Sequence, residues 1–110
     1  MAVIDVVDIG KKMVEAAKVV LKDKWPEARM FAESEAQKFA QNMAEIALWK
    51  EQKKITEEQA QALSRLHQRS MKMVLTAIEG ISLAMAEKAT NSAIEAIRGV
   101  VNAAIGWIVL

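Results

Sequence analysis

The sequence contains no cysteine and no tyrosine, and its only proline is Pro26. Without cysteine the chain has no disulfide framework, no thiolate metal site and no thiolate nucleophile. Its few aromatic residues are three tryptophans and two phenylalanines, whereas the strands of sandwiches and barrels use aromatic residues heavily. These absences argue against an all-β fold and favour a helical one.

An excess of charge of either sign is also missing. The 15 basic and 14 acidic side chains are balanced along the whole chain. A nucleic-acid binder needs a basic surface that neutralises phosphates, so we expect no nucleic-acid partner. The N-terminal segment carries Asp5 and Asp8 where a secretory signal would carry Lys or Arg, and we therefore expect a cytoplasmic location.

Long hydrophobic runs are absent too. The longest uncharged stretch, residues 99–110, is far shorter than the ~20 residues of a membrane-spanning helix. This excludes a spanning helix and leaves contact with a membrane surface as an alternative. The apolar fraction of 53% excludes disorder, and 110 residues suit one core. We expect a single helical domain over residues 1–110.

Apolar residues that recur every three or four positions predict helices at about residues 3–22, 26–53, 57–89 and 93–108. Pro26 is well placed in a first turn, and Thr56 with Gln59 forms a capping box. A second such box, from Ser92 to Glu95, follows the weak helix formers at 89–91. The sequence therefore predicts an all-α, antiparallel up-down-up-down bundle.

A second arrangement fits the same residues. A heptad seam runs from Met71 to Leu110 without interruption, straight through the proposed break at residues 89–91. The third and fourth helices would then be one, and the chain would form a long two-helix hairpin that dimerises into a four-helix bundle.

The last predicted helix carries two adhesive faces. One is a seam of small residues that lets two helix backbones approach closely, and the other is bulkier. The small residues are Ser92, Ala96, Gly99, Ala103 and Gly106, and the bulkier ones include Ile97, Val101 and Ile108. A monomer needs only one broad face, so the pattern predicts a homo-oligomer, most simply a dimer, with another protein as a further candidate partner.

His67 is the only histidine, and it lies among apolar positions of the third helix. Di-iron bundles use Glu-x-x-His pairs, but the residue three positions before His67 is Ser64. His67 is therefore a weak candidate metal ligand, and we expect no metal and no cofactor.

Arg65, Arg69 and Lys72 are spaced four and three residues apart, so they form one basic stripe on the third helix. Such a stripe is typically a solvated flank, and it is also a weak candidate for binding an anion or an acidic partner.

No residues form a nucleophile with its base and oxyanion hole, and no glycine-rich phosphate loop is present. The sequence thus predicts a non-enzymatic helical interaction or assembly module that self-associates through its C-terminal helix. The alternatives are a dimeric metal-binding bundle and a membrane-surface-associated helical protein.

Overall fold

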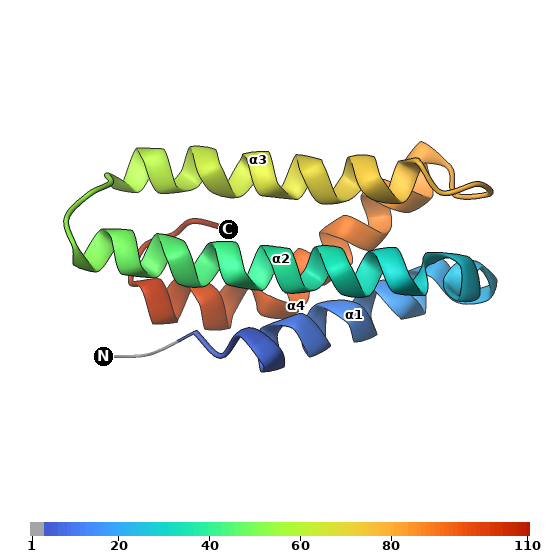
Figure 1. The fold of residues 1–110 in the computed structure, drawn as a ribbon, viewed down its shortest axis with the longest axis horizontal. Coiled ribbons are helices and arrows are strands. Elements are labelled where there is room, and N and C mark those ends of the chain that lie inside the picture. Colours follow the sequence, from blue (N-terminus) through green and yellow to red (C-terminus); the bar gives the residue numbers. More distant parts are fainter. Residues whose placement is uncertain (1–3) are drawn as a thin grey trace.

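The computed structural model describes residues 4–110, which form an antiparallel up-down-up-down bundle of α-helices without strands (Figure 1). Its elements are α1 (Val6–Leu21), a short 3-10 helix η1 (Lys22–Lys24), α2 (Trp25–Glu51), α3 (Glu57–Thr76) and α4 (Leu83–Ile105). The bundle is elongated, measuring 43 × 22 × 18 Å. The predicted all-α bundle is confirmed.

Local sequence signals start the first three helices. Asp5 precedes α1, and its carboxylate accepts a hydrogen bond from the backbone N–H of Asp8 at 3.1 Å. Pro26 lies in the first turn of α2, where its missing N–H costs nothing. The Thr56 hydroxyl accepts from the Gln59 N–H at 3.1 Å, and the Gln59 side chain accepts from the Thr56 N–H at 2.9 Å. The predicted capping box at Thr56 is confirmed.

The break between α3 and α4 lies at residues 77–82, so the predicted helices 57–89 and 93–108 are wrong in their bounds. Gly80 takes a φ of +88° in this connection, a value that L side chains rarely adopt. The hydroxyl of Ser82 then caps α4 by accepting from the Met85 N–H at 3.1 Å. Ser92 lies inside α4, so its capping-box pattern does not mark a helix start.

Packing explains why residues 89–91 stay helical. Ala86, Ala89 and Ala93 are buried, and the first two belong to one core cluster with residues of α1. A loop here would pull the alanines out of the contact. The connection at 77–82 also interrupts the heptad seam, so the long continuous helix and its two-helix hairpin do not form.

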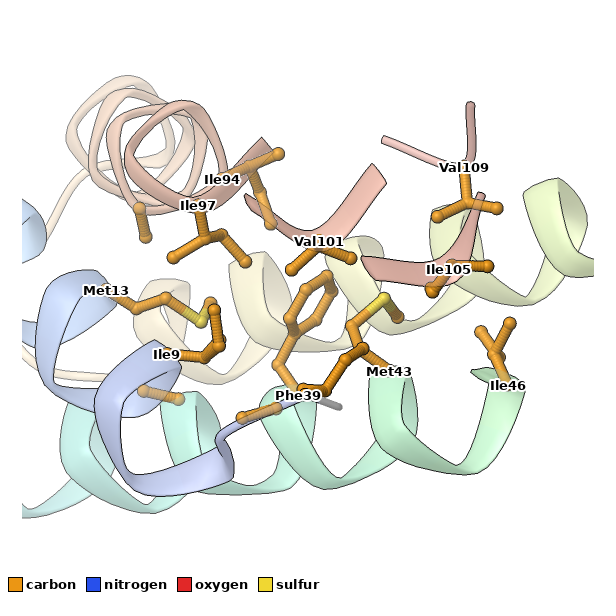
Figure 2. Close-up of a cluster of buried hydrophobic side chains, with 14 of the residues drawn as sticks. Ile9, Met13, Phe39, Met43, Ile46, Ile94, Ile97, Val101, Ile105 and Val109 are labelled. Carbon is orange, nitrogen blue, oxygen red and sulfur yellow. The ribbon is translucent and has the colours of Figure 1, made fainter. Parts of the chain in front are cut away.

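The core is built mainly by α1, α2 and α4. Figure 2 shows the Phe39 ring pointing from α2 toward Val101 of α4, with Ile97 and Ile9 beside it. The apolar residues that recur every three or four positions along α2 are buried; they are Ala32, Ala36, Phe39, Met43 and Ile46. The 20-residue α3 buries four residues, as the 16-residue α1 does, but two of those in α3 are small; the four are Ala60, Ser64, Met71 and Leu75. This helix is therefore the most loosely attached of the four.

The chain after α4 folds back onto the bundle. Gly106 ends the helix with a φ of +84°, and Asn102 then binds the segment that follows. The Asn102 side-chain oxygen accepts from the N–H groups of Val109 and Leu110, both at 3.0 Å. Gln61 of α3 donates to the Ile108 carbonyl at 2.8 Å, which ties the C-terminal segment to α3.

Candidate functional site

The structure separates the eight predicted interface residues into different environments. Ile97 and Val101 are completely buried in the subunit's own core, so they present nothing to a partner. The small residues Ala96, Gly99 and Ala103 are exposed on the opposite side of α4, and Ser92 is half-buried at the start of this row. Only the small-residue part of the predicted interface therefore lies on the surface.

Gly106 and Ile108 lie beyond the regular part of α4. Gly106 is exposed, and its φ of +84° explains its identity, because L side chains rarely adopt this conformation. Ile108 is 70% exposed in the C-terminal segment. Gly106 is thus a helix-ending glycine, whereas the sequence grouped it with the small residues of the seam.

The exposed face of α4 has one bulky residue that the predicted interface omitted. Val100 is 49% exposed and lies beside the small residues Ala96, Gly99 and Ala103. We call these four residues the outer α4 face. A Cβ added at Gly99 would meet nothing within 4 Å, so the close packing of this subunit does not require glycine here.

Charges border the outer α4 face without entering it. Glu95 and Arg98 form an ion pair along the helix, one turn apart. The half of α4 that precedes Ser92 is more polar on its outside, where Glu87, Lys88 and Asn91 are exposed. From Gly99 to the end of α4, by contrast, the exposed residues are uncharged.

The predicted basic stripe lines a groove between α3 and α4. This groove of about 160 Å³ is formed by Arg65, Gln68, Arg69 and Lys72 of α3 together with Glu87, Thr90 and Asn91 of α4. The ion pairs in residues 4–110 all join partners on one helix, and none of them involves a charged residue of the groove. The three cations therefore face one carboxylate without pairing to it. We call this site the α3/α4 groove.

Thr90 is the buried member of the α3/α4 groove. It is 4% exposed, and its hydroxyl has no hydrogen-bond partner among the described residues. A buried hydroxyl without a partner costs about 1–3 kcal/mol relative to a satisfied one. Thr90 is not among the site residues predicted from the sequence, although a threonine among the alanines and isoleucines of a buried helix face is a signal in itself.

His67 lies half-buried on α3, at the edge of the core. Burial lowers the pKa of its imidazole below the ordinary value of 6.5, while the nearby Glu45 carboxylate acts in the opposite direction. Glu35 of α2 is also buried, and its carboxylate lies 3.3 Å from the Lys38 Nζ. Within residues 4–110, no three His, Cys, Asp or Glu side chains are grouped so as to hold a metal ion.

In the described part of the chain, none of the helices combines the length and the apolar character that crossing a bilayer requires.

Comparisons of the chain with protein-family models, with curated proteins and with solved structures found no match.

Proposed function

We propose that this protein is a non-enzymatic interaction module that forms a homodimer through the outer α4 face. The observation that carries the proposal is the division of α4 into two apolar sides. One side packs into the subunit's own core, where Ile97 and Val101 are completely buried. The other remains uncharged and exposed over Ala96, Gly99, Val100 and Ala103.

The chemistry of this face suits a second copy of the same helix. Small side chains let two helix backbones approach closely, and the distance between helix axes depends on the side chains at the contact. Val100, which is about half exposed, would supply the apolar area that alanine and glycine lack. A two-fold axis across Gly99 would place the same patch on both subunits, as an isologous interface requires.

The presence of glycine at position 99 is further support for a partner helix. In a helix interior, glycine is about 0.5–1 kcal/mol less favourable than alanine. Within the subunit nothing prevents alanine at position 99, because the space around the missing Cβ is open. Close approach by a second helix would explain why the less favourable residue stands there.

Gly10 of α1 offers a matched control. It too lies inside a helix, and its missing Cβ would also meet nothing within 4 Å. Gly10→Ala and Gly99→Ala should therefore stabilise the isolated subunit equally, by about 0.5–1 kcal/mol. Only Gly99→Ala should weaken the dimer.

Sedimentation equilibrium over a range of protein concentrations tests the proposal. We expect the wild type and Gly10→Ala to approach twice the mass of one chain, and Gly99→Ala to dissociate at higher concentration. Ala96→Glu, which puts a charge into the face, should give monomers, whereas Ala62→Glu on the exposed side of α3 should not. Monomeric wild-type protein at all concentrations would refute the proposal, and so would equal dimerisation of Ala96→Glu and Ala62→Glu.

A further inference from the structure

We propose that the α3/α4 groove binds a small phosphate-bearing anion, either inorganic phosphate or a small phosphate monoester. This site is separate from the outer α4 face. Thr90 points to the buried side of α4, whereas Ala96, Gly99 and Ala103 are on its exposed side. The two proposals can therefore fail independently.

The charge of the groove is the first argument. Arg65, Arg69 and Lys72 contribute three positive charges, and Glu87 contributes one negative charge. None of the four forms an ion pair within residues 4–110. A dianion would balance the remaining charge of the groove, because the sum of three cations and one carboxylate is two positive charges.

The side-chain types are the second argument. A guanidinium group can bind two phosphate oxygens at once through parallel N–H donors, and hydrogen bonds between ionised partners are the strongest in proteins. Arg65 and Arg69 are four residues apart, so both lie on the same side of α3 and line the groove together. Gln68 of α3 and Asn91 of α4 add neutral amide donors from the two walls.

Thr90 is the third and independent argument. Thr90 lines the groove, and its hydroxyl is buried beneath the surface without a partner in the described residues. Rotation of the Thr90 side chain would turn this donor toward a phosphate oxygen bound in the groove. A purely structural residue at this position would be better as valine, which has the same shape and leaves no unsatisfied polar atom.

The size of the groove limits the ligand. A volume of about 160 Å³ suits a phosphate group with a small attached moiety, and it is well below the roughly 300–1,000 Å³ of pockets that enclose drug-sized ligands. The balanced charge of the remaining chain gives no extended basic surface for a polyanion. We therefore commit to a small anion rather than a nucleic acid.

Isothermal titration calorimetry of the full chain with inorganic phosphate, and separately with phosphoserine, tests the site at constant ionic strength. We expect saturable binding of at least one of them. Tighter binding of phosphate identifies the free anion as the preferred form, and tighter binding of phosphoserine identifies a monoester. No heat above that of matched sodium chloride for either ligand would overturn the proposal.

Four variants locate the binding. Arg69→Gln should weaken it by about ten-fold or more, the factor expected for loss of a charge-assisted hydrogen bond, whereas Lys54→Gln on the exposed loop should leave it unchanged. Glu87→Gln removes the repelling carboxylate and should tighten binding several-fold. Thr90→Val should raise the melting temperature of the free protein and yet weaken phosphate binding. Equal binding by Arg69→Gln and Lys54→Gln, or unchanged binding by Thr90→Val, would refute the proposed site.

Discussion

Lys50 of α2 contacts the C-terminal end of α4. Replacing it gives the most direct test of how much this contact between helices stabilises the bundle. The ammonium group donates to the Ile105 carbonyl at 2.6 Å and lies 4.8 Å from the centre of the Trp107 ring. The last turn of α4 contains no basic residue of its own. Lys50 therefore supplies the positive charge that a helix C-terminus favours.

We expect Lys50→Met to destabilise the protein by about 2 kcal/mol. A hydrogen bond to a charged group contributes about 1.5–3 kcal/mol, and a cation over an aromatic ring about 0.5–1 kcal/mol. The two contributions overlap, because both depend on the same ammonium group, and Lys50 is only half-buried. Methionine keeps most of the aliphatic stem, so the loss should come from the charge rather than from packing.

Urea unfolding at one fixed protein concentration, followed by circular dichroism, measures this loss. For a chain of this size, about 2 kcal/mol corresponds to a melting temperature lower by roughly 8 °C. Lys54→Met is the matched control, since Lys54 is exposed and its ammonium group makes no ion pair or hydrogen bond with the described residues. We expect a change within about 0.5 kcal/mol for the control. An equal effect of both substitutions would contradict the role assigned to Lys50.

Combining Lys50→Met with Trp107→Leu separates the ring contact from the carbonyl contact. The coupling energy of this double-mutant cycle should be about 0.5–1 kcal/mol if the ammonium group interacts with the indole ring. A coupling energy of zero would leave the Ile105 carbonyl as the only partner of Lys50.

Two further predictions concern the start of α4 and the imidazole of α3. Ser82→Ala should lower the free energy of unfolding by about 1 kcal/mol, because the N-cap of α4 is lost. Ser92→Ala lies inside the helix and should leave the free energy of unfolding unchanged or raise it. If urea unfolding showed Ser92→Ala to be the more destabilising of the two, the helix boundary would lie at residue 92 instead. The folded pKa of His67 lies below its unfolded value of 6.5, so the unfolded state binds the proton first and stability should fall as the pH drops from 7.5 to 5.5. His67→Gln should flatten this part of the stability profile, and an unchanged slope would show that burial does not disfavour the imidazolium.

The faces of the helices were predictable because helical periodicity is repeated over many residues. Ala36, Phe39 and Met43 on α2 are all buried as their spacing predicts. The boundary between α3 and α4 depends instead on a few residues. Ser82 caps the helix, but the third residue after it is Met85, so it lacks the glutamate or glutamine that completes a capping box.

The candidate sites, too, could be predicted from the sequence only in part. Periodicity put Arg65, Arg69 and Lys72 on one side of α3, and these residues do share a groove. The opposite wall, with Thr90, was not predictable, because it depends on which helix packs beside α3. Likewise, sequence alone placed Ile97 and Val101 at an interface with a partner, whereas tertiary packing assigns both to the subunit's own core.

The weak attachment of α3 has a consequence for the motions of the bundle. Two of its four buried residues, Ala60 and Ser64, bury little apolar area, so detaching this helix costs less than detaching α1 or α2. Its amide protons should exchange with solvent through openings that leave the rest of the molecule intact. The α3/α4 groove would be lost in each such opening, so an occupied groove should slow the exchange of α3 more than that of any other helix.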